Sequence, residues 1–233
     1  MLRRLRGAVA DIAFIGVAAW WPSAIGSWWQ QRHSRGVYHR LADLYDVEVA
    51  SDLHYGLPLQ AAITRVHATP SWILDVSTGT GYAALALTER FPHARIAACD
   101  LSAHMLRQAV GNAARAGRQL LLTRANSRAL PYRAGTFDLV VLQNALPLFQ
   151  EMVRVLKVEG ALLACFSTGA RVPRLFLTAL KRRLRRYGIA EVEIVRVGPG
   201  LFIYGRKMAP LPPPGMAVSP LPADSSGSKR SAQ

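Results

Sequence analysis

Two glycines one residue apart follow an apolar run in the stretch WILDVSTGTGYAALAL, which covers residues 72–87. Gly79, Gly81 and Ala84 fit the pattern G-x-G-x-x-A, and Asp100 ends the next apolar run at about the twenty-residue spacing of a dinucleotide fingerprint. Such glycines let the backbone approach a ligand, the following helix offers free N–H groups, and the acid accepts ribose hydroxyls. The spacing therefore predicts a site for a nucleoside cofactor without saying which one.

Asp75 narrows the choice of cofactor because it lies four residues before Gly79, at the end of the apolar run. A carboxylate at this place repels a pyrophosphate, whereas it suits a ligand that carries an ammonium and a sulfonium. The acid therefore favours a cationic nucleoside cofactor over NAD.

Two further stretches follow in order: NSRALPYRAGTFDLVVLQNA at residues 126–145 and EMVRVLKVEGALLACF at residues 151–166. With the glycine loop they resemble the class I S-adenosylmethionine-dependent methyltransferases, in particular the branch that includes the ubiquinone and menaquinone biosynthesis methyltransferases. The resemblance runs from about Tyr38 to Lys207. It implies S-adenosylmethionine as the cofactor and methyl transfer as the reaction, in which the protein chiefly aligns the reactants in a dry pocket.

The resemblance also implies the cofactor-binding residues, which are Asp75, Ser77, Gly79, Gly81, Asp100, Leu101, Asn126 and Gln143. Asp100 would bind the ribose hydroxyls with Leu101 against the adenine, and Asn126 would bond the adenine amino group. Gln143 and Asn144 would end a strand beside the reacting methyl. Two departures stand out: Ser77 replaces a glycine of the family, and the stretch 141–151 is shorter than the family's substrate-contacting connection.

No catalytic residue is assigned, because a sulfonium already activates its methyl group. A weakly acidic acceptor would need a general base, for which the candidates are His54, Tyr45, Tyr55 and Asn144. No metal-ligand spacing is present, and the two cysteines, Cys99 and Cys165, lie in apolar runs and are expected to be buried thiols.

Short apolar runs alternate with helical patterns along the middle of the chain, which predicts a parallel sheet with helices on both faces. The run VEIVRVGPGLFIYGRK at residues 192–207 predicts a final antiparallel pair joined across Gly198–Gly200. Together with the resemblance, this predicts an α/β fold: a doubly wound, mostly parallel, seven-stranded Rossmann-like sheet. The expected strands are 72–76, 96–99, 120–123, 139–142 and 161–166, with helices from Tyr82, after Ser102 and through Val155.

The chain divides into an apolar segment at 1–36, a methyltransferase domain at 37–208 and a disordered Pro/Ser-rich tail at 209–233. Residues 8–29 are nearly all apolar, are interrupted by Asp11 and Pro22, and end in four tryptophans. We expect this segment to contact a membrane surface, with a cytoplasmic domain peripheral to the membrane. The alternative is a helix packed against the domain's own core.

The formal net charge of +15 raises the question of a nucleic-acid partner. The excess is spread along the chain, and only residues 181–186 form a dense basic run, so we expect no nucleic-acid partner. The expected partner is a small, apolar acceptor that is lipid- or quinone-like, with residues 38–59 as a lid. Two alternatives stay open: an RNA or protein methyltransferase that uses the 181–186 run, and a non-catalytic methyltransferase-like domain.

Overall fold

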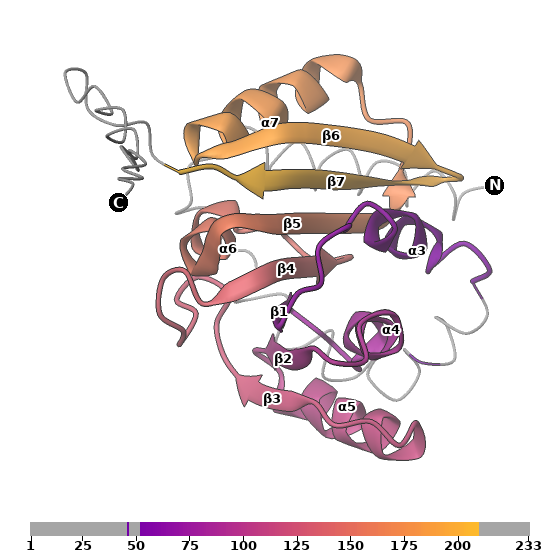
Figure 1. Cartoon of the computed structure of the whole chain (residues 1–233). Helices are drawn as coiled ribbons and strands as arrows, with labels where there is room; N and C mark the ends of the chain where they lie inside the picture. Colours follow the sequence, from indigo (N-terminus) through magenta and orange to yellow (C-terminus); the bar gives the residue numbers. More distant parts are fainter. Residues whose placement is uncertain (1–45, 47–51, 210–233) are drawn as a thin grey trace, which may run out of the picture.

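A computed structural model describes residue 46 and residues 52–209. Seven strands form one sheet in the order β3-β2-β1-β4-β5-β7-β6 (Figure 1). The strands are β1 (Trp72–Val76), β2 (Arg95–Asp100), β3 (Leu121–Arg124), β4 (Phe137–Gln143), β5 (Leu156–Gly169), β6 (Ile189–Val197) and β7 (Gly200–Lys207). The first five strands pair in parallel, and β7 runs antiparallel to both β5 and β6. The predicted seven-stranded sheet with an antiparallel C-terminal pair is confirmed.

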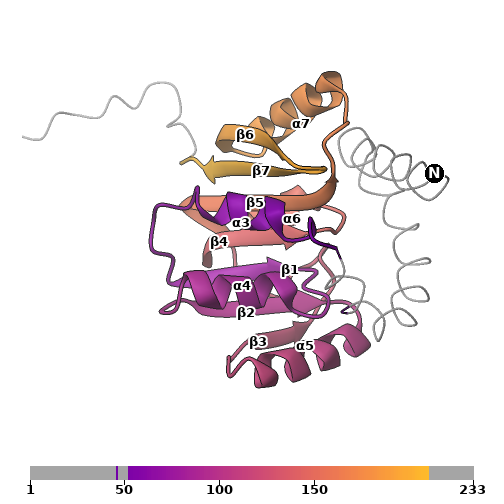
Figure 2. The ribbon, with the colours of Figure 1, turned by 90° about the vertical axis from the view of Figure 1, so that its right-hand side faces the viewer.

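Helices cover both faces of the sheet, as Figures 1 and 2 show together. They are α3 (Leu57–Ile63), α4 (Tyr82–Arg90), α5 (Ala103–Arg115), α6 (Phe149–Val155) and α7 (Arg174–Arg186). Residues of α3 and α4 share one buried cluster, and residues of α6 and α7 share the other. Because side chains alternate along a strand, Ile73 joins the first cluster whereas Leu74 and Val76 join the second.

The predicted elements recur within five residues of their expected ends, and β1 and the start of α4 lie where they were expected. The largest difference is β5, which begins five residues before the expected Ala161: Leu156 pairs with Phe137, and the register shifts before Ala161 pairs with Leu139, within the stretch where Glu159 has φ 65°. Between β3 and β4 the described chain has no helix. The short helix α3 was not expected, since its start within residues 38–59 was interpreted as a lid.

Parallel strands end at the same edge of a sheet, and this rule places the candidate residues. Asp75 lies one residue before the end of β1, Asp100 ends β2 and Gln143 ends β4. Both cysteines are buried and unpaired, as predicted. Among the described residues, no helix is long and apolar enough to cross a membrane. The apolar segment 8–29 and the tail from 210 onward lie outside the described residues.

Candidate functional site

The loop between β1 and α4, residues 77–81, holds three residues in the left-handed region. Ser77 has φ 57°, Gly79 φ 57° and Gly81 φ 91°. Glycine adopts this conformation without a Cβ penalty, whereas Ser77 occupies it at a cost. The loop is nevertheless tied down, since the Thr78 N–H donates to the Cys99 carbonyl at 2.9 Å and the Gly81 N–H to the Thr78 carbonyl at 3.0 Å.

The two glycines of the loop have different surroundings. A Cβ added to Gly79 would meet no atom within 4 Å among the described residues, so the space beside this residue is open. A Cβ on Gly81 would lie 3.3 Å from the Cβ of Ala109 on α5. Gly81 therefore allows close packing of α4 against α5, and Gly79 leaves room for a ligand to approach the backbone.

Asp100 joins the loop to the end of β2. Its Oδ2 accepts from the Gly79 N–H at 2.9 Å, and its Oδ1 accepts from the Ser102 N–H at 2.8 Å. Burial raises the pKa of this carboxyl, and the Ser102, Gly79 and Leu101 N–H groups oppose the rise. The carboxylate is thus fixed beside the open space at Gly79. Its neighbour Leu101 is partly buried, and its carbonyl accepts from Arg124 Nε at 3.1 Å.

Asp75 is 1% exposed and faces the α3–α4 side of the sheet. Thr78 Oγ1 donates to its Oδ2 at 2.6 Å, whereas its Oδ1 has no hydrogen bond of normal length within the described residues. Burial raises its pKa to about 7, with opposing contributions from the Thr78 hydroxyl and the Ala84 N–H. Such a carboxylate gains from a cation placed next to it.

Gln143 and Asn144 stand at the end of β4, on the strand next to β1. Gln143 is 8% exposed, and its Nε2 donates to the Tyr55 carbonyl at 3.1 Å. Its Oε1 has no partner among the described residues. Gln143 therefore holds the 52–56 turn against the sheet and offers one free acceptor atom.

Asn126 lies in a turn after β3 and is partly buried. Its Oδ1 accepts from the Arg128 N–H at 3.1 Å, which orients the amide within the turn. Asn126 therefore follows the same edge of the sheet as Asp100, one strand further out, since β2 and β3 pair in parallel.

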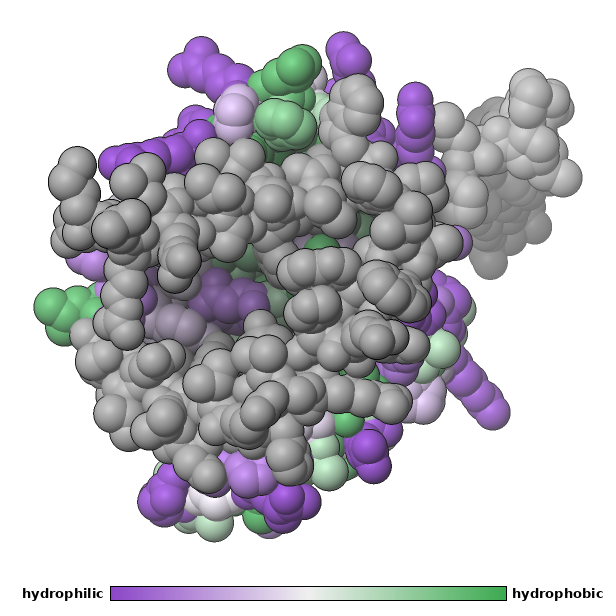
Figure 3. Space-filling view, turned by 180° about the vertical axis from the view of Figure 1, so that it is seen from behind, coloured by the Kyte–Doolittle hydropathy of each residue, from purple (hydrophilic) through white to green (hydrophobic). Residues whose placement is uncertain are grey.

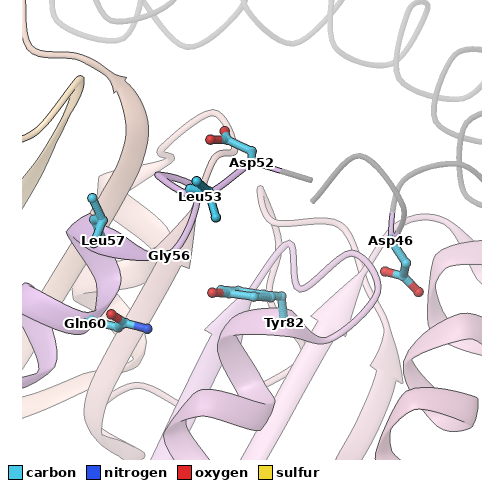
Figure 4. Close-up of a pocket in the computed structure, with 7 residues that line it drawn as sticks. All are labelled: Asp46, Asp52, Leu53, Gly56, Leu57, Gln60 and Tyr82. Carbon is cyan, nitrogen blue, oxygen red and sulfur yellow. The ribbon is translucent and has the colours of Figure 1, made fainter. Parts of the chain in front are cut away.

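A cavity of about 350 Å³ opens beside α4 (Figure 4). It is lined by Asp46, Asp52, Leu53, Gly56, Leu57, Gln60 and Tyr82. The ring of Tyr82 meets that of Tyr55 edge-on at 5.0 Å. Leu53 is 87% exposed, so the rim of the cavity carries an apolar side chain in water.

The structure describes three of the four candidate bases, and they lie in different surroundings. His54 is exposed and its N–H donates to Asp52 Oδ1, so it acts as a turn residue in this structure. Tyr55 packs on Tyr82, Asn144 lies at the end of β4, and Tyr45 lies outside the described residues. No base is assigned among the described residues.

Sequence reasoning missed Asn112, in the middle of α5. Its Nδ2 donates to the Thr80 carbonyl at 2.9 Å and to Asp46 Oδ2 at 3.0 Å. Asn112 therefore holds both the glycine loop, at Thr80, and Asp46, which lines the cavity. The only signal in the sequence was an asparagine inside a helical pattern, where this residue type is disfavoured.

The residues fit an S-adenosyl cofactor on their own geometry. Open space at Gly79, a fixed carboxylate at Asp100 and unpartnered buried atoms on Asp75 and Gln143 lie along one edge of the sheet. Buried polar groups without a partner are rare and call for a ligand or water. On the face opposite to that of Figure 1, hydrophilic residues of the described chain are visible near the middle of the molecule (Figure 3).

The sheet order and the β1–α4 loop are those of a Rossmann-like fold. Residues 73–160 match the family model described as a methyltransferase domain. The resemblance read from the sequence is confirmed, and with it S-adenosylmethionine as the cofactor of the proteins that the chain resembles.

Among the relatives is a malonyl-[acyl-carrier protein] O-methyltransferase of Geobacter sulfurreducens, 35% identical over 56% of this chain and 51% of that protein. A ubiquinone/menaquinone biosynthesis C-methyltransferase of Syntrophotalea carbinolica is 34% identical over 56% of this chain and 59% of that protein. The chain thus spans only a little over half the length of these relatives. A crystal structure from Methanococcus maripaludis, assigned as an S-adenosylmethionine-dependent methyltransferase, superposes with a TM-score of 0.62 at 19% identity, covering 74% of this chain and 94% of that one.

Proposed function

We propose that this protein transfers a methyl group from S-adenosylmethionine to a small, apolar acceptor that is lipid- or quinone-like. The observation that carries the proposal is the arrangement at Asp100. Its carboxylate, held by the Gly79 and Ser102 N–H groups, stands beside the open space at Gly79 at the place where a ribose would bind. The buried Asp75 supplies the negative charge that a cationic cofactor needs and a pyrophosphate does not.

Each remaining cofactor residue has a part in this proposal. Asn126 would meet the adenine amino group with Leu101 against the ring, and Gln143 Oε1 would accept from the methionine part. Ser77 would shape the loop by its left-handed backbone. When bound, the cofactor supplies a methyl group that its own positive charge activates. The chain then has to align the acceptor, hold it close to that methyl and exclude water.

The cavity and the relatives both support an apolar acceptor. Leu53, Leu57 and Tyr82 contribute apolar surface to the cavity, and the acidic residues Asp46 and Asp52 also line it (Figure 4). The two relatives named above are an O-methyltransferase of malonyl-[acyl-carrier protein] and a C-methyltransferase of ubiquinone and menaquinone biosynthesis. An apolar acceptor would also agree with membrane contact through residues 8–29, which we keep as part of the proposal.

Titration calorimetry tests the cofactor first. S-adenosylmethionine and S-adenosylhomocysteine should both bind, and NAD should not. Methyl transfer is then measured with the malonyl thioester of N-acetylcysteamine and with a short-chain demethylmenaquinol. Binding of NAD in preference to S-adenosylhomocysteine would refute the proposal.

A further inference from the structure

Asn144 is the first residue after β4, and its backbone is in the left-handed region with φ 50°. Asparagine tolerates this region better than most residues, but the conformation still has to be held by its surroundings. The Asn144 N–H donates to the Cys165 carbonyl on β5 at 2.9 Å. The neighbouring strand therefore fixes the backbone at this point.

The side chain of Asn144 is also fixed, and its orientation follows from its partner. Its Oδ1 accepts from the Ser167 N–H at 2.8 Å and from Ser167 Oγ at 3.2 Å. A backbone N–H only donates, so the atom that faces it must be the amide oxygen. The amide nitrogen is therefore the other atom of the pair, and Ser167 determines where it lies.

That nitrogen, Asn144 Nδ2, is buried and has no hydrogen-bond partner among the described residues. Gln143 next to it has an unpartnered oxygen, and Asp75 on the adjacent strand has another. Val76 pairs with Leu142 in the sheet, so the glycine loop and the Gln143–Asn144 pair leave neighbouring strands at the same level. These three atoms thus belong to residues at the carboxyl ends of two neighbouring strands, the edge at which we place the cofactor and the acceptor.

We propose that Asn144 Nδ2 donates a hydrogen bond to an oxygen of the methyl acceptor, that Ser167 is the positioning residue, and that the acceptor is therefore an oxygen-bearing group and not an amine. The inference rests on the methyl transfer proposed above. It adds the chemical class of the acceptor and the residue that selects it.

The preference for oxygen follows from the number of lone pairs. A neutral amine has one lone pair, and a hydrogen bond from Nδ2 would occupy the pair needed for attack. A carboxylate or phenolate oxygen accepts the hydrogen bond on one pair and keeps others. In the transfer, an electron pair of the acceptor forms the new bond to the methyl carbon. The carbon–sulfur bond breaks, and its pair stays on the sulfur, which becomes a neutral thioether. A carboxylate that arrives as an anion needs no base, whereas methylation at a ring carbon also releases the proton of that carbon to solvent.

The location of Asn144 can be tested without knowing the acceptor. Sinefungin is an analogue of S-adenosylmethionine that carries an amine-bearing carbon in place of the methyl-bearing sulfur. In Asn144→Asp the carboxylate still accepts from the Ser167 N–H, and its second oxygen replaces the donor. We expect the affinity for sinefungin relative to S-adenosylhomocysteine to rise about tenfold in this variant, because a carboxylate would face the ammonium.

Gln150→Glu is the matched control, since Gln150 is exposed on α6 and the change adds the same charge. In this control the ratio should equal that of the wild type. An unchanged ratio in folded Asn144→Asp, as judged by its melting curve, overturns the inference. If the wild type does not bind S-adenosylhomocysteine, the proposed function itself is refuted.

Further variants at Asn144 and Ser167 distinguish the loss of the contact with the acceptor from a loss of folding. Asn144→Gly keeps the left-handed backbone and removes the donor, so it should bind S-adenosylhomocysteine normally while transfer to the malonyl thioester or demethylmenaquinol falls at least tenfold. Ser167→Ala removes only the hydroxyl contact to Asn144 Oδ1 and keeps the backbone N–H that orients the amide, so it should lower kcat less than Asn144→Gly does without raising KM, and Ser167→Thr should restore kcat. Turnover of an amine probe such as histamine, with neither oxygen probe methylated, would overturn the assignment of the acceptor class.

Discussion

Asp75→Asn is the variant that most directly probes the buried carboxylate. Burial raises the pKa of Asp75 from 3.8 to about 7, so the folded state holds this proton more tightly than the unfolded state. The resulting stability is fully present below pH 3.8 and is lost as the pH rises through about 7. At about 1.4 kcal/mol for each pKa unit, the loss amounts to about 4 kcal/mol.

The Asp75→Asn substitution removes the titrating carboxyl group but places an amide N–H₂ in the same buried position. Thr78 Oγ1 still has an oxygen to donate to, whereas the unpartnered N–H₂ costs about 1–3 kcal/mol at every pH. The variant should therefore be less stable than the wild type near pH 4 and more stable near pH 8. The difference in the free energy of unfolding should change by about 4 kcal/mol between these two pH values.

Urea denaturation of the cofactor-free protein at several pH values from 4 to 8 measures this difference. Asp138→Asn serves as the control, because the Lys157 ammonium and the Trp72 and Ser71 N–H groups hold the pKa of Asp138 below its usual range despite some desolvation. That variant should lose stability by a nearly constant amount over this pH range. If the free energy of unfolding of Asp75→Asn also differs from that of the wild type by a constant amount over this pH range, Asp75 is not a buried acid with a raised pKa. In the wild type, affinity for S-adenosylmethionine should rise as the pH passes through 7, and Asp75→Asn should lack this rise.

Four further changes test other parts of the molecule. Asp100→Ala should weaken S-adenosylhomocysteine binding by about 1–3 kcal/mol, because the ribose hydroxyls lose a charged acceptor, and unchanged affinity in calorimetry would contradict this role. Gly79→Val should abolish cofactor binding in a folded domain, whereas Gly117→Val, which has the same backbone strain and equally open surroundings, should lose only stability; equal affinities in the two variants would refute the assignment. Ser77→Gly should raise the free energy of unfolding by about 0.5–1 kcal/mol, since it relieves a left-handed serine, and a lower urea midpoint would show that the serine side chain stabilises the loop. Deletion of residues 1–31 should free the protein from anionic liposomes in a flotation assay while cofactor binding persists; full-length protein that ignores liposomes, or a truncated chain that melts early, would favour a helix packed on the core.

Most of the fold was predictable because each strand carries a local signal. The run Trp72–Val76 was predicted with its observed ends, since it is apolar, short and followed by turn residues. Ser102 marked the start of α5, and its hydroxyl accepts from the Met105 N–H as an N-cap does. The length of β5 was not predictable in the same way, because its first residues are ordered by pairing across the sheet and not by their own pattern.

Within the candidate site, the sequence predicted those residues whose role depends on the local backbone conformation. The glycines and Asp100 follow from spacing, because their roles depend on a turn between a strand and a helix. Asn112 and Ser167 had no such signal, since their partners lie 32 and 23 residues away along the chain. Long-range contacts of this kind depend on which strands become neighbours, and a single sequence does not display that order.

The place of β7 in the sheet has a consequence for how the chain matures during synthesis. Of the strands in the described part of the chain, β7 is made last, yet it lies between β5 and β6 and pairs with both. Until residue 207 has left the ribosome, the apolar β5 has one unpaired side, and such an edge invites pairing with other chains. Nascent chains that stop short of Gly200 should therefore be recognised by chaperones as unfinished, however complete their cofactor loop already is.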